Sequence, residues 1–344
     1  MKTVILLSLF LQITIASAGE DVKFIYPNND KIYISGAFFL LKSKECVVIN
    51  RFNTTFLEMK ETLMNAKKAN TQTGVSVSFS TNSQNMKVIF KERQDAEHRQ
   101  KVFGIFKNGE FFTEINSLEL EFENLEGQVK TEWEVVLPSF YGLDFGGIEI
   151  DTNADLYKTT RVKRPVYVAI GNSITHGVGQ NGAGFLTYPF LLAKQKDWQL
   201  YNLAVGGSKI SWSVAQLLKN REVNIITILW GYNDWNGGFT TENDIRPNYI
   251  KLLEELRKVQ PTAKIYCILP TVSKRKTPKT GKQSLEEVRL CQLDCVTCLQ
   301  REGDDNLFII KGADITTEKD LNDDVHLSVS GAANFAQNLG EIIN

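Results

Sequence analysis

The sequence has almost no net charge and very little histidine. Its 39 lysines and arginines balance 40 aspartates and glutamates to leave a formal net charge of −1, which gives no reason to expect nucleic acid as a partner. The three histidines, His98, His176 and His326, are too dispersed for a metal-binding cluster. No G-x-G-x-x-G and no P-loop lysine–hydroxyl pair adjoins the Gly206-Gly207 turn. We therefore expect no metal and no cofactor.

Beyond its first residues the sequence has no apolar run that could cross a bilayer, which takes about 20 residues. A short basic start, an apolar stretch over Val4 to Ile15 and Ala16-Ser17-Ala18 are typical of a secretory signal peptide cleaved after Ala18. Ser8 and Gln12 interrupt this stretch, which is too short for a membrane anchor. We predict a signal peptide over residues 1–18, a secreted or periplasmic protein, and no membrane insertion after cleavage.

Cysteine is scarce, and the five residues are odd in number, so at least one is free or makes an intermolecular bond. Cys291, Cys295 and Cys298 have the spacing C-x3-C-x2-C, which resembles an iron–sulfur motif. The segment Ser284 to Gln300 is patterned as an amphipathic helix, on which this spacing marks one face. We interpret these cysteines as small apolar residues and not as metal ligands.

The 344 residues fit two domains with different patterns. From 19 to 160, short alternating runs such as Val75 to Ser80 and Met86 to Phe90, with an Asn-Gly turn at Asn108-Gly109, predict a β-sandwich of the jelly-roll type. Phe56 to Ala69 is patterned as a helix. The change of pattern lies near residues 159–163.

From 164 to 344, apolar strands alternate with helical patterns, which predicts βαβ units and a mainly parallel sheet covered on both faces. The predicted strands are Val166–Ile170, Leu200–Leu203, Ile225–Leu229, Ile265–Leu269 and Leu307–Ile310, and two of the predicted helices are Tyr249–Val259 and Ala332–Ile343. The fold class is therefore α/β, preceded by an all-β domain.

Polar and glycine residues follow three of these strands. Ser173 comes just after the first, Gly207 after the second and Asn233 after the third. In an open parallel sheet, the carboxyl ends of the strands border one crevice, so these residues are expected to meet there. A serine alone in such a turn is more often a helix N-cap.

Four blocks in order resemble the SGNH, or GDSL-like, hydrolase family. They are Gly171-Asn172-Ser173, Asn202 to Gly207, Gly231-Tyr232-Asn233-Asp234 and Asp323-Asp324-Val325-His326. The resemblance implies a three-layer, flavodoxin-like hydrolase domain. One departure is Asn172, where the family usually has Asp; Asn is nearly isosteric and keeps one acceptor, but removes a charge.

Ser173 needs a general base to act as a nucleophile. His98 lies in a charged, solvated stretch, and His176 could flank the crevice but reaches Ser173 awkwardly. His326 lies in a loop before the last helix, where an acid three residues earlier can fix its tautomer. The family pattern favours Asp323 as this acid, with Asp324 as the alternative.

A tetrahedral oxyanion also needs donors. The backbone N–H groups of Ser173 and Gly207 and the side-chain amide of Asn233 can supply them. The family pattern assigns Gly207 over Gly206. An α/β-hydrolase is the nearest mechanistic rival, but its G-x-S-x-G motif does not occur in the sequence.

An exported SGNH protein with an N-terminal β-sandwich looks most like the carbohydrate esterases that remove acetyl groups. We therefore expect an acylated carbohydrate or other small ester as the substrate. A lipolytic or thioesterase-type acyl hydrolase and a non-catalytic carbohydrate-binding protein are the alternatives. Tyr232, Trp235 and Phe239 could stack on a sugar, and the basic loop 274–282 could contact an acidic polymer. The oligomeric state is left open.

Overall fold

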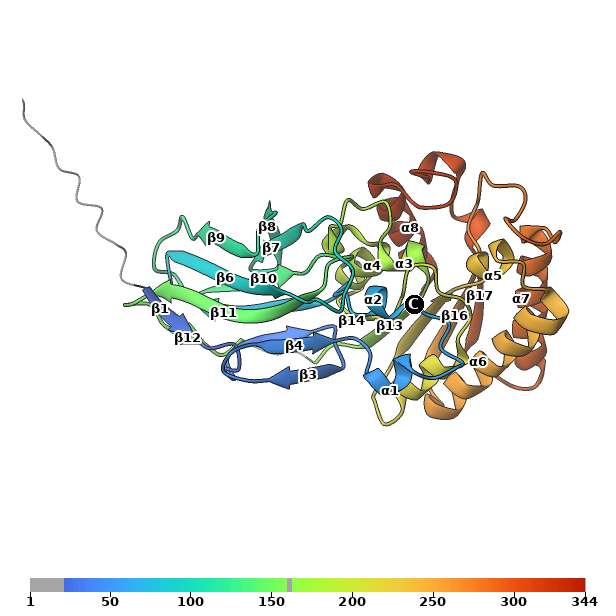
Figure 1. The fold of residues 1–344 in the computed structure, drawn as a ribbon, viewed down its shortest axis with the longest axis horizontal. Coiled ribbons are helices and arrows are strands. Elements are labelled where there is room, and N and C mark those ends of the chain that lie inside the picture. Colours follow the sequence, from blue (N-terminus) through green and yellow to red (C-terminus); the bar gives the residue numbers. More distant parts are fainter. Residues whose placement is uncertain (1–21, 160–162, 344) are drawn as a thin grey trace, which may run out of the picture.

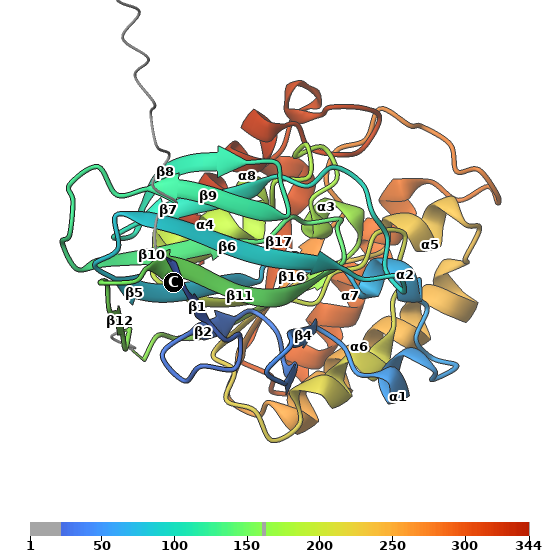
Figure 2. The same cartoon turned by 60° about the vertical axis from the view of Figure 1, so that its left-hand side comes forward.

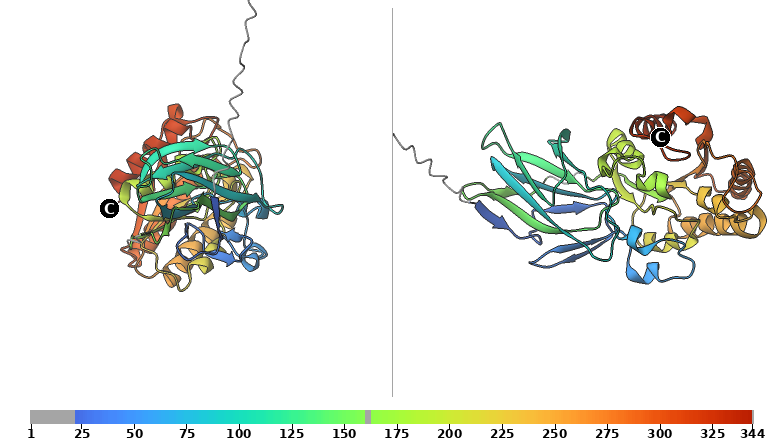
Figure 3. Two further views of the ribbon diagram at one scale, coloured as in Figure 1. Left: turned by 90° about the vertical axis from the view of Figure 1, so that its left-hand side faces the viewer. Right: turned by 45° about the horizontal axis from the view of Figure 1, so that its top comes forward.

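A computed structural model describes residues 22–159 and 163–343 of the chain. The predicted signal peptide, residues 1–18, lies outside the described residues. Antiparallel strands occupy one end of the molecule and a parallel sheet with its helices the other (Figures 1 and 3). The change from one arrangement to the other falls between Tyr157 and Val166, where the sequence pattern also changes.

The N-terminal half contains two six-stranded antiparallel sheets. The first has the order β3-β4-β11-β6-β9, with β1 beside β11. Its strands are β1 (Val22–Ile25), β3 (Phe39–Lys42), β4 (Val47–Asn50), β6 (Asn85–Glu92), β9 (Glu119–Glu123) and β11 (Leu143–Asp151). The second has the order β12-β5-β10-β7-β8, with β2 beside β5. Its strands are β2 (Tyr33–Ser35), β5 (Ser76–Thr81), β7 (Phe103–Lys107), β8 (Glu110–Ile115), β10 (Thr131–Val136) and β12 (Leu156–Tyr157).

Alternating side chains hold these two sheets together. Val77 and Phe79 of β5 belong to the same buried cluster as Ile148 and Ile150 of β11, because every second residue of a strand faces the same side. The longer strands of both sheets lie roughly along one axis (Figure 2). The turn between β7 and β8 has positive φ at Asn108 (50°) and Gly109 (89°), as the Asn-Gly pair predicts for a tight hairpin. Jelly-roll connectivity stays a prediction.

One predicted element is wrong. Residues 56–69 do not form a helix; two single turns, α1 (Thr54–Leu57) and α2 (Ala66–Ala69), stand at either end of the segment. Asn53 and Asn65 each cap one turn with their side chains, so the chain starts a helix twice. Between the turns, Thr62 bonds to the Phe56 carbonyl and to Ser213 of the C-terminal half, which are tertiary contacts that the apolar pattern does not contain.

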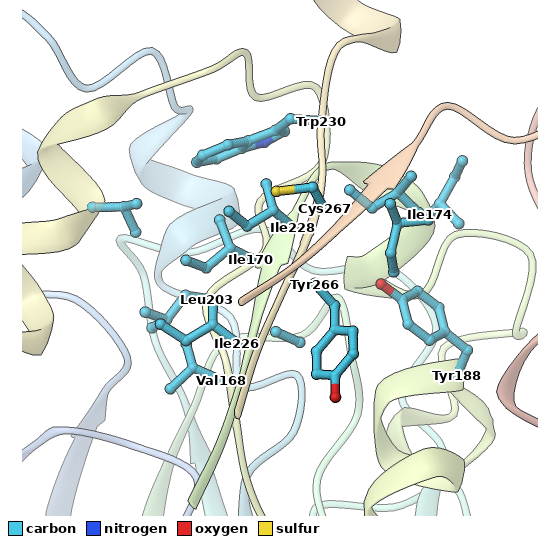
Figure 4. Packing of buried hydrophobic residues seen from close by; sticks show 14 of the residues in the cluster. Val168, Ile170, Ile174, Tyr188, Leu203, Ile226, Ile228, Trp230, Tyr266 and Cys267 are labelled. Atoms are coloured by element: carbon cyan, nitrogen blue, oxygen red, sulfur yellow. The ribbon is translucent and has the colours of Figure 1, made fainter. Parts of the chain in front are cut away.

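The C-terminal half is built on a five-stranded sheet in which every pairing is parallel. Its strands are β13 (Val166–Gly171), β14 (Gln199–Asn202), β15 (Ile225–Leu229), β16 (Lys264–Leu269) and β17 (Leu307–Lys311). The order β14-β13-β15-β16-β17 is the 2-1-3-4-5 order of flavodoxin-like sheets. Ile170, Ile228 and Cys267 lie side by side on neighbouring strands, beneath Trp230 (Figure 4).

Helices pack on both faces of this sheet (Figure 1). The longer ones are α4 (Tyr188–Lys196), α6 (Arg246–Val259), α7 (Leu285–Arg301) and α8 (Val329–Ile342); α3 (Ser173–His176) and α5 (Tyr232–Asn236) are single turns. Further short turns are η1 (Gly184–Leu186), η2 (Trp212–Leu218), η3 (Thr241–Ile245), η4 (Gly312–Asp314) and η5 (Glu318–Asp320). Within residues 22–159 and 163–343, none of the helices has the length and apolar character to span a membrane.

The cysteine-rich helix is present as predicted. Ser284 caps α7 with a capping box, and Cys291 and Cys295 face the core, whereas Cys298 is exposed. All five cysteines are free thiols in the structure. Among the described residues, no group of three or more histidine, cysteine or acidic side chains is arranged to hold a metal ion.

Candidate active site

Ser173 stands where strand β13 gives way to α3. The side chain of Asn172 caps this turn by accepting the N–H of Ile174 at 3.1 Å, so the acceptor that Asn shares with Asp is the one in use. Gly171 is required here, because a Cβ at this position would lie 2.2 Å from Thr175 Oγ1. Gly177, with φ of 108°, ends the helix after one turn. The tight strand-to-helix turn therefore presents the Ser173 hydroxyl at the carboxyl ends of the parallel strands.

His326 and Asp323 complete a hydrogen-bonded chain with this serine. His326 Nε2 lies 2.8 Å from Ser173 Oγ, and His326 Nδ1 lies 2.7 Å from Asp323 Oδ2. The other Asp323 oxygen accepts the backbone N–H groups of Val325 and His326, both at 2.8 Å. The carboxylate therefore holds the proton on Nδ1 and leaves Nε2 free to accept the serine proton, as in a Ser-His-Asp triad.

Two opposing effects act on the Asp323 carboxyl. Partial burial acts to raise its pKa, but the N–H groups of His326 and Val325 and the imidazole outweigh burial and hold the pKa below its usual value. Asp323 is therefore ionised at neutral pH. The neighbouring carboxylate of Asp324 points elsewhere and lies 3.4 Å from the guanidinium of Arg275. Of the two acids that the sequence left open, only Asp323 contacts the imidazole.

Three donors follow the carboxyl ends of neighbouring parallel strands, at the same edge of the sheet as Ser173 Oγ. Among the described residues, the backbone N–H of Gly207 has no acceptor, whereas the N–H of Gly206 is bonded to His176. Gly207 is also exposed and has a φ of 84°. The Asn233 amide donates one hydrogen to the Ser208 carbonyl at 2.9 Å, which orients the group and leaves its second hydrogen available. With the N–H at the start of α3, these groups could stabilise an oxyanion.

The two other histidines lie apart from this triad. His98 is exposed, as its charged surroundings predict, and its ring centroid lies 4.7 Å from that of Tyr141 at a tilt of 54°. His176, expected at the mouth of the crevice, is instead fully buried between the two halves of the chain. The possibility that its ring flanks the mouth is therefore wrong, because the buried ring bonds to Thr71, Ser139 and Gly206.

A glycine-rich segment follows α3 and supports the His326 loop. Gly177, Gly179 and Gly182 have the G-x-G-x-x-G spacing, but they follow a helix and do not open one. A Cβ on Gly179 would lie 2.1 Å from the Leu327 carbonyl oxygen, and Gln180 donates to that oxygen at 2.8 Å. These residues hold the backbone just after His326.

The basic loop, residues 274–282, borders the site, and its backbone is hydrogen-bonded to the segments on either side. Lys274 donates its backbone N–H to the Asp324 carbonyl at 2.8 Å, beside the triad acid. At the other end, Lys279 donates its N–H to Asn236 Oδ1 at 3.1 Å. The loop thus links the His326 loop to α5, while the side chains of Lys274 and Lys279 are exposed.

The three aromatic residues near Asn233 differ in exposure. Tyr232 and Trp235 are 9% and 1% exposed, so stacking of these two on a sugar is excluded by burial. Phe239 is half-buried, and the Lys209 ammonium lies 3.8 Å from its ring centre.

The N-terminal half also reaches the site, which the sequence did not disclose. Lys68 of α2 places its ammonium 3.9 Å from the position that a Cβ on Gly207 would take. No motif marks Lys68, because its place depends on how α2 packs on the C-terminal half (Figures 1 and 3).

Asp234, next to Asn233, is a fully buried acid. Burial raises the pKa of its carboxyl to about 7, against the opposing hydrogen bond from the Ile210 N–H. Within the described part of the chain, Asp234 Oδ2 has no hydrogen-bond partner. A pKa that rises from 3.8 to about 7 on folding means that the folded state keeps the proton longer than the unfolded state.

We expect Asp234→Asn to change the pH dependence of stability. The stability that the neutral carboxyl provides is full below about pH 4 and is lost as pH rises to about 7, at a cost of up to about 4 kcal/mol. The stability of the variant relative to wild type should therefore rise between pH 4 and pH 7 and level off above pH 8. Urea unfolding at each pH measures this difference, and a flat difference would contradict the assignment.

A serine, a histidine and an aspartate in one chain of hydrogen bonds, beside a parallel 2-1-3-4-5 sheet, have the arrangement of a serine-hydrolase site. Residues 169–333, just under half of the chain, match the GDSL-like Lipase/Acylhydrolase family. The family resemblance inferred from the four blocks is thereby confirmed.

Solved structures share the fold of both halves. The salicylyl-acyltransferase SsfX3 from a tetracycline biosynthetic pathway is 18% identical, with a TM-score of 0.77 over 92% of this chain and 95% of that protein. A GDSL-like lipase candidate from Bacteroides ovatus is 16% identical, with a TM-score of 0.75 over 94% and 97%. The acetyl xylan esterase Est2A from the rumen bacterium Butyrivibrio proteoclasticus is 14% identical, with a TM-score of 0.65 over 94% and 98%. No curated protein matches the sequence.

Proposed function

We propose that the protein is a secreted serine esterase that removes acetyl or other short acyl groups from carbohydrate. The observation that carries the proposal is the hydrogen-bonded chain from Ser173 Oγ through His326 to Asp323, with contacts of 2.8 and 2.7 Å. Export rests on the predicted signal peptide, with the mature chain comprising a sandwich domain to residue 160 and a hydrolase domain from 164.

In the proposed mechanism, Ser173 Oγ attacks the ester carbonyl while His326 Nε2 takes the hydroxyl proton. Negative charge develops on the carbonyl oxygen, and the N–H groups of Ser173 and Gly207 and the Asn233 amide stabilise it. Collapse of the tetrahedral intermediate breaks the ester bond, and His326 returns the proton to the leaving alcohol. Water, activated by the same imidazole, then hydrolyses the acyl-enzyme and releases the acid.

Two observations favour a carbohydrate ester over a lipid. The segment after Asn233 is polar, with only Phe239 of its aromatic residues partly exposed, and does not resemble the apolar lid of a lipase. Est2A, which shares the fold over most of both chains, is an acetyl xylan esterase. Acetyl specificity is thus the hypothesis that we put to the test.

Acyl chain length is the discriminating measurement. We expect kcat/KM on 4-nitrophenyl esters to fall at least about tenfold from acetate to octanoate, because a polar crevice offers a long chain little apolar surface to bury. The same enzyme should also release acetate when it is incubated with a panel of acetylated polysaccharides. Faster hydrolysis of octanoate would favour the lipolytic alternative, and no release from any ester would favour the non-catalytic one.

A further inference from the structure

His176 is bonded to the backbone of the loop that carries the proposed oxyanion donor. Its Nδ1 lies 2.9 Å from the backbone nitrogen of Gly206, and its Nε2 lies 2.8 Å from the Ser139 carbonyl oxygen. A carbonyl can only accept, so Nε2 carries the proton, and Nδ1 accepts the N–H of Gly206. The ring is fully buried, and these two bonds fix one neutral tautomer.

The surroundings of the ring keep it neutral. Burial and then the positive charge of Arg51 hold the pKa of His176 well below 6.5, and Arg99 and Lys68 act in the same direction. Phe140 stacks on the ring with centroids 3.7 Å apart. At neutral pH, Nδ1 is therefore permanently available as an acceptor.

The bond to Gly206 constrains the next peptide, which carries the free donor. Ser208 closes the turn by donating its N–H to the Val205 carbonyl at 3.0 Å, and Gly206 is held by His176. Between these two anchored groups stands Gly207, whose N–H has no acceptor among the described residues. With both neighbours held, the Gly207 N–H has one defined direction.

Arg51 anchors the beginning of the same loop. Its guanidinium donates to the carbonyls of Asn202 and Ala204, both at 2.8 Å. Its other bonds go to Thr71 at 2.6 Å and to Lys68 and Ala69 at 3.2 Å. In the described part of the chain, no carboxylate pairs with Arg51, and burial lowers its pKa to about 9. This cation therefore ties the loop to the N-terminal half through carbonyls alone.

We propose that His176 is a positioning residue, which aims the Gly207 N–H at the developing oxyanion by holding the N–H of Gly206. Because Ser139, Thr71 and Arg51 all belong to the N-terminal half, that half is part of the catalytic apparatus and not merely an attached module. The proposal rests on the proposed esterase function. It assigns no proton transfer to His176.

Two substitutions at His176 distinguish the role of Nδ1 from that of Nε2. In His176→Asn, the side-chain oxygen can take the place of Nδ1 and still accept from Gly206. In His176→Gln, the amide nitrogen can take the place of Nε2 and still donate to Ser139, but no acceptor faces Gly206. We expect H176Q to lose about 10- to 100-fold in kcat, less than the 10²–10³ for removal of a whole donor, with KM within about twofold. H176N should retain kcat within about threefold of wild type.

A boronic acid that forms a tetrahedral adduct with Ser173 provides a second readout. Its inhibition constant should rise in H176Q by about the factor by which kcat/KM falls, because both depend on the oxyanion donor. Exposed His98 supplies the matched controls, and H98N and H98Q should both behave as wild type. Melting temperatures show whether the variants are folded.

Several results would overturn the proposal. Equal loss of kcat in H176N and H176Q, or a loss that follows melting temperature alone, would leave His176 with a purely structural role. If H176Q does not fold, Arg51→Lys is the second test. The lysine ammonium cannot reach all five carbonyls that Arg51 contacts, so kcat should fall. A wild-type kcat in R51K would overturn the role assigned to the N-terminal half. If wild-type protein hydrolyses no ester, the proposed function fails instead, and the two failures are distinct.

Discussion

Ser173→Ala is expected to lower kcat for ester hydrolysis by about 10⁶-fold, since a catalytic serine removed from a triad costs about that much. The variant lacks the atom that forms the acyl-enzyme in the proposed mechanism, and His326 Nε2 loses its hydrogen-bond partner at 2.8 Å. Acetate release and 4-nitrophenyl acetate hydrolysis measure the loss. The binding of substrate and the melting temperature should change little.

Ser330→Ala is the control for this experiment, because Ser330 is an exposed serine on α8, close in sequence to the His326 loop. It should keep wild-type activity. If Ser173→Ala retained more than about 1% of kcat, the serine mechanism would be wrong, whatever the fold.

Asp323→Asn is expected to lower kcat by about 10⁴-fold while leaving the fold intact. The side-chain amide that this change introduces can donate to Nδ1, which moves the imidazole proton to Nε2, where the ring can no longer accept the serine proton. Asp324→Asn is the matched control, since its carboxylate lies beside Arg275 and not beside the imidazole. It should keep kcat within about twofold. A larger loss for Asp324→Asn than for Asp323→Asn would reverse the assignment.

Much of the C-terminal half could be predicted from the sequence. The predicted strand Ile225–Leu229 has the observed bounds, and the other four differ by at most one residue at either end. The three inner strands, β13, β15 and β16, are buried on both faces, so each is a continuous apolar run that the sequence displays directly. The helix predicted over residues 56–69 is wrong, because Asn caps and a contact with Ser213 interrupt an apolar pattern that is continuous in the sequence.

The candidate site was predictable in part for a related reason. Ser173, Gly207 and Asn233 each follow a strand, and parallel strands bring their carboxyl ends to one edge. His326 and Asp323 are three residues apart, so a single turn accounts for their contact. The structure brings the imidazole to the serine across 153 residues of sequence.

The sequence by itself determined the order of the strands' apolar runs, the residues proposed for acyl-transfer chemistry and the match of residues 169–333 to the GDSL-like Lipase/Acylhydrolase family. Only the tertiary structure decided that His176 is buried, that Arg51 holds the glycine loop and that Lys68 lies beside Gly207. The physical reason is that burial and hydrogen bonding between the two halves depend on how their surfaces pack. A local pattern of residues records the face of a strand or helix, but not the partner against which that face will lie.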